Sequence, residues 1–301
     1  MHFDVVVIGG GPAGLQAALT LGRARKSVLL CDAGPRRNAA ATHVHNFVTR
    51  DGTPPDEMRR IARAQLAAYP LVVLHDGAVR AITGQRDAFA IVRDNDIVHA
   101  RRVLLCTGMR DLLPPIDGFD ALWGTSIVAC PYCHGWEARD RSLGYLARNP
   151  APVEFALMLQ GWSPHVTLFT NGTVDVEPSV RARCAIQGVV IEERPIARLH
   201  AAGGRLTSVE LVDGAHRAID VLFHHPRQSH VPLVDALELT RQPTGHLLVG
   251  ATDAQTSIAG IYAAGDLVTP AQSAIGAAGS AMFAAAMINH DLCPLLHPVP
   301  R

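Results

Sequence analysis

The glycine-rich stretch at residues 9–14 constrains the fold of this chain more than any other part of its sequence. It reads Gly-Gly-Gly-Pro-Ala-Gly and follows residues 4–8, Asp-Val-Val-Val-Ile, an apolar run typical of a strand buried on both faces of a parallel sheet. Residues 15–22 then show helical periodicity. A strand, a Gly-x-Gly-x-x-Gly loop and a helix in this order predict a dinucleotide-binding α/β domain.

Each motif glycine has its own expected role in such a loop. Gly9 makes the tight turn, Gly11 lets backbone N–H groups approach a pyrophosphate, and Gly14 allows the helix to pack on the sheet. The next predicted strand, residues 27–31, ends at Asp32, whose carboxylate can accept hydrogen bonds from an adenosine ribose. A glycine-rich turn without a ligand is the alternative, but the strands, helix and acid in this order favour a nucleotide site.

A second element near the C-terminus favours a flavin over a nicotinamide nucleotide. Residues 258–263 form a short apolar strand that runs into Ala-Gly-Asp at residues 264–266, and residues 271–279 then begin a helix rich in small residues. Small residues let a helix pack closely against another backbone or a flat ligand. In flavoproteins this arrangement places the acid, here Asp266, against the ribityl hydroxyls and the helix N-terminus against the isoalloxazine ring.

The composition favours a two-domain enzyme. A chain of 301 residues is long enough for about two domains. Because Lys plus Arg and Asp plus Glu both number 27, the formal charge is zero and nothing indicates a nucleic-acid partner. No apolar run reaches the roughly 20 residues that span a bilayer, and the features of a secretory signal are missing. We therefore expect a cytoplasmic protein without a membrane segment.

Histidine and cysteine spacing predicts a redox site and no metal site. The histidines show no convincing ligand spacing, and we expect most to be surface or satisfied core residues, including His43, His45, His200, His216 and His246. Cys31, Cys106 and Cys184 lie among apolar or small residues and are interpreted as buried small hydrophobes. The remaining feature is Cys-Pro-Tyr-Cys-His-Gly-Trp-Glu at residues 130–137, whose two thiols could form a metal clip, a structural disulfide or a redox pair.

The redox interpretation of Cys130 and Cys133 is favoured. A zinc site needs four ligands, and the pair has neither a second Cys-x-x-Cys nor a well-spaced pair of histidines. Pro131 suits the first turn of a helix, where free N–H groups and the helix dipole lower the pKa of a thiol. His134 follows the second thiol directly, and because an imidazole titrates near neutrality it is a plausible base or acid for thiol exchange. Glu137 could orient His134 or complement the helix dipole.

Together these motifs resemble the low-molecular-weight thioredoxin reductase group of flavin disulfide oxidoreductases. The motifs that carry the resemblance span nearly the whole chain: residues 9–14, Asp32, Cys106-Thr107-Gly108, Cys130 to Cys133 and Thr256 to Asp266. The run at residues 130–137, with Arg37-Asn38 and the Asp51-Gly52 turn, is most similar to the branch of dithiol oxidases that act on natural products such as gliotoxin and holomycin.

The resemblance implies two Rossmann-like α/β domains of the three-layer FAD/NAD(P) type, the second inserted in the first. The flavin domain is expected at residues 1–114 and 226–301, and the inserted domain at 115–225. Cys133 would face the flavin, and Cys130 would exchange with substrate. A homodimer is implied as well. The implied FAD-binding residues are Gly9, Gly11, Pro12, Ala13, Gly14, Asp32, Arg37, Asn38, Thr107, Gly108, Gly265, Asp266, Gln272, Ser273 and Ala274.

A second glycine loop, for NADPH, is expected from the resemblance but is degraded in this chain. The corresponding loop at residues 147–152 reads Ala-Arg-Asn-Pro-Ala-Pro, so a side chain replaces a motif glycine and two prolines remove N–H donors. The basic cluster that binds the 2′-phosphate is replaced by Thr-Asn-Gly at residues 170–172. Both changes argue against NADPH, although Arg148 offers a cation for a different binding pose.

Three functions remain open at this stage. The first is an FAD-dependent oxidase that converts a small-molecule dithiol to a disulfide through Cys130, Cys133 and His134, with dioxygen as acceptor and hydrogen peroxide as product. The second is a reductase of thioredoxin or a related disulfide that is fed by ferredoxin, by another donor, or by NADPH in an altered pose. The third is a flavin redox sensor without turnover.

Overall fold

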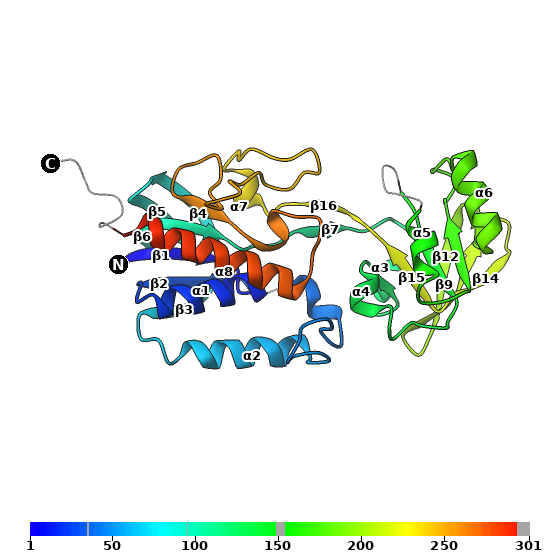
Figure 1. The fold of residues 1–301 in the computed structure, drawn as a ribbon, viewed down its shortest axis with the longest axis horizontal. Coiled ribbons are helices and arrows are strands. Elements are labelled where there is room, and N and C mark those ends of the chain that lie inside the picture. The colour runs from blue at the N-terminus through cyan, green and yellow to red at the C-terminus, as the bar shows by residue number, and fades with distance from the viewer. Residues whose placement is uncertain (35, 95, 149–153, 294–301) are drawn as a thin grey trace. The chain divides into compact units, whose positions relative to one another are not determined.

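The computed structural model describes residues 1–34, 36–94, 96–148 and 154–293. The chain forms two compact units (Figure 1). Unit 1 comprises Met1–Arg37, Thr53–Arg110 and Gln228–Arg301, and unit 2 comprises Asn38–Gly52 and Asp111–Arg227. Two of the crossings between the units lie in β7 (Arg110–Leu112) and β16 (Arg227–Ser229), which form a two-stranded sheet. Among the described helices, none is long and apolar enough to cross a membrane.

Unit 1 is built on a sheet of seven strands. Its order is β3-β2-β1-β6-β5-β4, with β17 paired to β6. Strands β1, β2, β3, β6 and β17 are mutually parallel, while β4 and β5 add an antiparallel extension to β6. The bounds are β1 (His2–Ile8), β2 (Val28–Asp32), β3 (Val72–Asp76), β4 (Val79–Gln85), β5 (Ala88–Arg93), β6 (Asp96–Leu105) and β17 (Ile261–Ala263).

The continuous apolar run of β1 follows from burial on both faces. Val5 and Val7 pack in one core cluster with residues of α1 and α8, whereas Val6 and Ile8 belong to a second cluster on the opposite face. Parallel strands covered on both sides need apolar side chains in both directions. The helical elements of unit 1 are α1 (Pro12–Arg23), α2 (Pro55–Leu66), α7 (Pro232–Asp235), η2 (Gly265–Leu267) and α8 (Ala274–Asp291), and η1 (Arg37–Ala40) crosses into unit 2.

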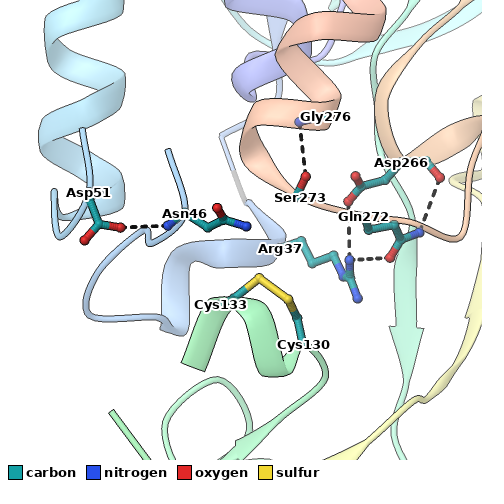
Figure 2. Close-up of a disulfide and its surroundings, with 9 residues drawn as sticks. All are labelled: Arg37, Asn46, Asp51, Cys130, Cys133, Asp266, Gln272, Ser273 and Gly276. Carbon is teal, nitrogen blue, oxygen red and sulfur yellow. Dashed lines mark hydrogen bonds and ion pairs between the residues drawn. A yellow bond between two sulfur atoms is a disulfide. The ribbon is translucent and has the colours of Figure 1, made fainter. Parts of the chain in front are cut away.

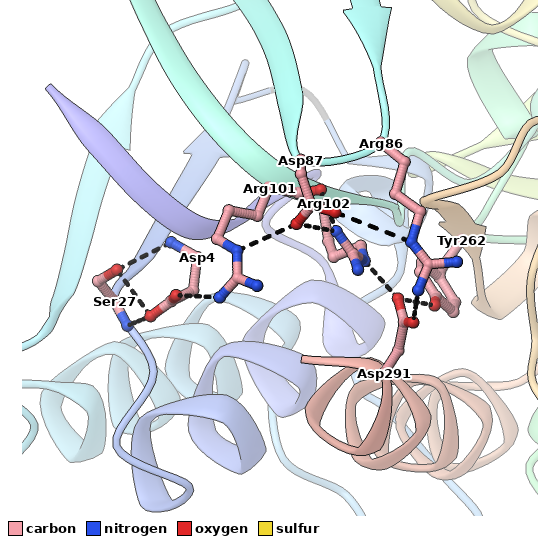
Figure 3. A network of polar contacts seen from close by, with 8 residues as sticks. All are labelled: Asp4, Ser27, Arg86, Asp87, Arg101, Arg102, Tyr262 and Asp291. Atoms are coloured by element: carbon pink, nitrogen blue, oxygen red, sulfur yellow. Dashed lines mark hydrogen bonds and ion pairs between the residues drawn. The ribbon is translucent and has the colours of Figure 1, made fainter. Parts of the chain in front are cut away.

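A buried polar network fixes the C-terminal end of α8 (Figure 3). Arg102 on β6 is 1% exposed, and its Nε donates to Asp291, the last residue of α8. The Tyr262 hydroxyl on β17 donates to the same carboxylate at 2.8 Å, and Arg102 also reaches Asp87 at 2.8 Å. A buried guanidinium is tolerated because two carboxylates accompany it. The network therefore holds the C-terminal end of α8 on the sheet.

Unit 2 combines a parallel and an antiparallel sheet. The parallel sheet has the order β11-β10-β9-β15-β8, and the antiparallel one has the order β12-β13-β14. The strands are β8 (Ile127–Val128), β9 (Leu143–Leu146), β10 (Val166–Phe169), β11 (Val190–Glu192), β12 (Ile196–Ala202), β13 (Arg205–Leu211), β14 (His216–Ala218) and β15 (Val221–His224). Its helices are α3 (Phe119–Leu122), α4 (Pro131–His134), α5 (Phe155–Leu159) and α6 (Pro178–Gln187).

The parallel sheet of unit 2 is also covered on both faces. One core cluster joins Tyr145 of β9 to Leu159 of α5 and Cys184 of α6, and another joins Leu222 of β15 to Val209 of β13. Two α/β units built on parallel sheets, the second inserted in the first, confirm the predicted fold class. The prediction that Cys31, Cys106 and Cys184 are buried is confirmed too, and burial raises the pKa of Cys31 to about 11.

The segment 38–52 differs from its predicted placement. The sequence assigns it to the flavin domain, but in the structure it packs within unit 2. Ala40 lies against Gly124 so closely that a Cβ on this glycine would be 2.6 Å from the Ala40 Cβ. His45 lies 3.6 Å from the carboxylate of Glu137. These are contacts between residues far apart in sequence, and no local pattern in the segment indicates them.

Candidate active site

The glycine loop connects β1 to α1 and is shaped by backbone contacts. Gly9 has φ +113°, and a Cβ there would lie 2.2 Å from the Cys106 carbonyl oxygen. A Cβ on Gly14 would lie 1.8 Å from the Gly9 carbonyl oxygen, so only glycine lets the start of α1 approach the loop. A Cβ on Gly10 would meet the Asp32 carboxylate at 2.1 Å. Three glycines of the loop are therefore required by its own packing.

Two other glycines face open space. An ideal Cβ on Gly11 or on Gly108 meets no atom within 4 Å among the described residues. Gly11 is the N-cap of α1, and Pro12 occupies the first turn, where its missing N–H is no loss. Thr107, beside Gly108, has an Oγ1 that is shielded from solvent yet has no hydrogen-bond partner among the described residues. An uncovered helix N-terminus next to an unpartnered hydroxyl fits the pyrophosphate of a dinucleotide.

Asp32 ends β2 beside this loop and is 5% exposed. Its carboxylate accepts hydrogen bonds from the Gly34 N–H at 3.0 Å and from the Arg59 guanidinium, whose Nε lies 3.2 Å away. Burial raises the pKa of Asp32, but the bonds from Arg59 and Gly34 outweigh it and hold the pKa below 3.8. Asp32 is therefore an ionised acceptor. Arg59 comes from α2, whose sequence contains several arginines that no local pattern distinguishes.

The residues expected near the ribityl chain and flavin ring form a polar cluster in unit 1 (Figure 2). Arg37 Nη1 lies 3.3 Å from Asp266 Oδ2 and 2.6 Å from Gln272 Oε1. Gln272 also exchanges hydrogen bonds of 2.9 Å with Gln228. Ser273 is the N-cap of α8, and its Oγ accepts from the Gly276 N–H at 3.1 Å. Arg37 is thus joined to Asp266 and Gln272, which lie 229 and 235 positions later in the sequence.

Most of the predicted cofactor residues converge within unit 1. The glycine loop touches Cys106 and Asp32, as described above, and a Cβ on Gly265 would lie 3.0 Å from the Ala13 Cβ. Arg37, Asp266 and Gln272 are hydrogen-bonded to one another. Asn38 is the exception, because it belongs to unit 2. The converging residues fit an FAD molecule in their residue types, and the space where a Cβ would lie at Gly11 and Gly108 is open among the described residues.

The thiol pair lies at the start of a short helix in unit 2. Cys130 is the N-cap of α4, Pro131 is its first residue, and Cys133 is joined to Cys130 by a disulfide (Figure 2). Both cysteines are half-buried. The expected position of Pro131 in the first helical turn is confirmed. Once the disulfide is opened, the free N–H groups of this turn favour a thiolate over a thiol.

His134 closes α4 next to Cys133. Its Nδ1 is shielded from solvent and has no hydrogen-bond partner among the described residues. Burial lowers the pKa of His134 below 6.5, while the backbone of Cys130 and the charge of Glu137 oppose that shift. The imidazole is therefore neutral at pH 7 and has a nitrogen able to accept a proton.

The surroundings of His134 include a second histidine that sequence reasoning did not single out. His45, from the segment 38–52, has Nδ1 3.6 Å from Asp51 Oδ1 and Nε2 3.6 Å from Glu137 Oε1. Glu137, expected to orient His134 or complement the helix, thus also lies against His45. The charge of His45 contributes to lowering the pKa of His134. Two aromatic side chains near the thiols in sequence are exposed, Tyr132 at 64% and Trp136 at 68%.

The expected second nucleotide loop lies partly outside the described residues, which omit 149–153. Of the rest, Ala147 is buried, and the Arg148 guanidinium donates through Nε to the His225 carbonyl oxygen. After β10, where the family binds a 2′-phosphate, Asn171 Oδ1 accepts from the Ile196 N–H at 2.7 Å. The polar groups here make hydrogen bonds to the chain's own backbone.

Two Rossmann-like units with a redox-capable disulfide at a helix start define a flavin-type disulfide oxidoreductase. The chain belongs to the pyridine nucleotide-disulphide oxidoreductase family, whose model matches residues 3–285. Membership implies an FAD cofactor and a thioredoxin reductase-like enzyme. The resemblance found in the sequence motifs is thereby confirmed.

Several relatives cover nearly the whole chain. The thioredoxin reductase tcpT of Claviceps purpurea is 34% identical over 275 residues, which is 87% of this chain and 86% of the relative. Among solved structures, an oxidoreductase from Agrobacterium tumefaciens has a TM-score of 0.91 at 36% identity and covers 99% of this chain and 100% of its own. HlmI has a TM-score of 0.90 at 36% identity, with 97% of this chain and 92% of its own covered.

Proposed function

We propose that this protein is an FAD-dependent oxidase that converts a small-molecule dithiol to a disulfide and passes the electrons to dioxygen. The observation that carries the proposal is the contrast between the two nucleotide regions. In unit 1 the backbone at Gly11 and Gly108 is open, whereas the polar groups of unit 2 at Arg148 and Asn171 bind the chain's own carbonyl and N–H groups. An enzyme that takes its electrons from a dithiol needs the first region and not the second.

The proposed exchange uses the disulfide between Cys130 and Cys133 as oxidant. A substrate thiolate attacks Cys130 Sγ, which forms a mixed disulfide and releases Cys133 as a thiolate. The second substrate thiolate then attacks the substrate sulfur of the mixed disulfide, closes the product disulfide and releases Cys130. Two electrons now reside on the reduced cysteine pair. FAD, when bound by the cluster in unit 1, supplies the two-electron acceptor, and reduction of dioxygen gives hydrogen peroxide.

His134 acts in this proposal as the base that accepts the proton of an incoming substrate thiol. Its neutral imidazole is suited to this because the pKa is below 6.5, so proton acceptance does not require alkaline pH. Tyr132 and Trp136, whose side chains are exposed, would offer apolar contact area to a small cyclic substrate. A thioredoxin-like protein is the alternative partner. The proposed homodimer is compatible with exposed apolar residues on α8, namely Ile275, Met282 and Phe283.

The test is anaerobic mixing of the FAD-loaded protein, first with NADPH and then with a small dithiol, while the flavin absorbance is followed. We expect rapid bleaching by the dithiol and none by NADPH, and dithiol-dependent peroxide in air. Cys130→Ser should abolish both responses, while Cys293→Ser, which changes a cysteine outside the pair, should retain them. Rapid bleaching by NADPH would instead support the reductase alternative. Unchanged turnover in Cys130→Ser would reject the thiol relay.

A pH profile tests the role of His134. Dithiol-driven flavin reduction should fall as the pH drops through the lowered pKa of His134, because the protonated ring accepts no proton. The substrate thiol contributes its own pH dependence, so the comparison is with His134→Gln on the same substrate. That variant should lose the acidic limb and react about 100-fold or more slowly at neutral pH. An acidic limb that is unchanged in the variant would assign it to another group.

A further inference from the structure

A group of potential metal ligands lies on the antiparallel sheet of unit 2. His200 is on β12, Glu210 on β13 and His216 on β14. One ligand atom from each of the three residues lies within 4.8 Å of the others. The three residues are 10 and 6 positions apart in sequence, so only the strand pairing unites them. We propose that His200, Glu210 and His216 form a binding site for a divalent transition-metal ion, with Zn²⁺ as the ion of first choice.

The strand register places the three side chains on one face of the sheet. Glu210 lies opposite His216, and His200 lies opposite Ser208, which is two residues from Glu210 and shares its face. The alternate residue of the central strand, Val209, is fully buried in the core beneath. The metal-ligating side chains therefore occupy the outer face, where His200 and Glu210 are half-buried and His216 is exposed. An ion can reach them from solvent.

The distances suit coordination after small side-chain rotations. His200 Nε2 lies 2.6 Å from Glu210 Oε2, and the rings of His200 and His216 have centroids 5.1 Å apart. Zinc binds imidazole nitrogen and carboxylate oxygen at about 2.0–2.2 Å, so ligand atoms around one ion lie roughly 3.4 Å apart. His216 Nδ1 is 3.4 Å from Ser208 Oγ. A hydrogen bond on one ring nitrogen is the arrangement that presents the other to a metal.

The donor set selects the class of ion. Two imidazoles and one carboxylate suit Zn²⁺, Ni²⁺, Co²⁺ or Cu²⁺, whereas Mg²⁺ and Ca²⁺ prefer oxygen ligands. Glu210 supplies the carboxylate ligand, and its Oε2 lies 2.6 Å from His200 Nε2. The nearby cation Arg198 is paired with Asp117 at 2.6 Å. A bound ion would connect three strands of the sheet through their side chains.

Isothermal titration of the FAD-loaded full chain with ZnCl₂ tests the site. The protein is freed of metal by a chelator, carries no affinity tag and keeps its disulfide oxidised. We expect one Zn²⁺ per chain, and a loss of affinity of about tenfold or more in each of His200→Asn, Glu210→Gln and His216→Asn. The matched control is His75→Asn, which removes a histidine that pairs with Asp94 at 3.0 Å in unit 1. Its Zn²⁺ affinity should equal that of the unchanged protein.

Thermal unfolding and the absorption of bound Co²⁺ test the site independently. Zn²⁺ should raise the Tm of the unchanged protein by about 2 °C or more, but not that of His216→Asn, whose exposed position makes it the least disruptive change. Co²⁺ should give visible absorption beyond the flavin band without the intense near-ultraviolet band of thiolate ligation. No Zn²⁺ binding, or binding that is the same in His216→Asn, would overturn the proposal. Thiolate-type Co²⁺ spectra would also overturn it, because they would assign the ion to cysteines.

Discussion

The segments after β1 and β2 in unit 1 and those after β9 and β10 in unit 2 have equivalent places in two similar folds, but their described polar groups are used differently. In unit 1, Gly11 and Gly108 leave backbone uncovered, and the next strand ends at the ionised acceptor Asp32. In unit 2, Arg148 and Asn171 donate to or accept from the chain's own backbone. A repeated fold therefore does not imply a repeated ligand, because ligand binding needs polar groups that the fold itself does not consume.

The largest expected effect distinguishes a glycine that the fold needs from one that the cofactor needs. Gly14→Ala places a Cβ 1.8 Å from the Gly9 carbonyl oxygen, so α1 must move and the free energy of unfolding should fall by about 3 kcal/mol or more. Gly11→Ala meets no described atom within 4 Å and should change that free energy by less than about 0.5 kcal/mol. Denaturant unfolding gives both values.

The amount of bound FAD should also differ between Gly14→Ala and Gly11→Ala. FAD should be lost from Gly14→Ala along with the fold, but from Gly11→Ala with the fold intact, because only the added methyl group obstructs the pyrophosphate. Far-ultraviolet circular dichroism checks the fold, and absorbance of the purified protein measures bound flavin. Full retention of FAD by Gly11→Ala would contradict the proposed position of the cofactor.

The second prediction concerns pH and the region around Arg148. Burial, with the neighbouring His224 and Arg148, lowers the pKa of His225 from 6.5 to about 4. Above pH 6.5 the His225 ring is neutral in both the folded and the unfolded chain. Between pH 6.5 and 4 the ring is protonated in the unfolded chain but stays neutral in the folded one. Stability should therefore fall by up to about 3 kcal/mol over this interval from His225 alone. In His225→Gln this part of the acid slope should disappear, and equal slopes in the two proteins would refute the assignment.

The smallest expected effects compare Asp32, at the end of β2, with Asn171, which follows β10. Asn171→Ala removes the acceptor for the Ile196 N–H and leaves alanine at φ +53°, so unfolding should become easier by about 2 kcal/mol with no change in FAD content. Asp32→Asn removes the charge that faces Arg59 and should weaken FAD binding by about tenfold. Measuring stability and FAD affinity for both variants tests the contrast. A loss of FAD in Asn171→Ala would contradict the predicted contrast between the two units.

Local patterns were sufficient to predict the fold class and much of the candidate site. The run at residues 4–14 predicted β1, the loop and the start of α1, because a continuous apolar run and the glycine spacing are properties of neighbouring residues. Pro131 likewise predicted the first turn of α4. Arg59 and His45 could not be found this way. Their partners Asp32 and Glu137 lie far away in the sequence, and only packing shows which of many charged residues meet.

By itself, the sequence determined two nucleotide-type units, a thiol pair at a helix start and a degraded second glycine loop. The tertiary structure decided which groups remain available for chemistry. It assigned residues 38–52 to the unit that holds the thiols, gave His134 a neutral ring, and brought His200, Glu210 and His216 together across three strands. The physical reason is the separation in sequence between the residues that interact. Turns, caps and periodicity depend on adjacent residues, whereas burial, hydrogen-bond satisfaction and ligand clusters depend on which distant segments come into contact.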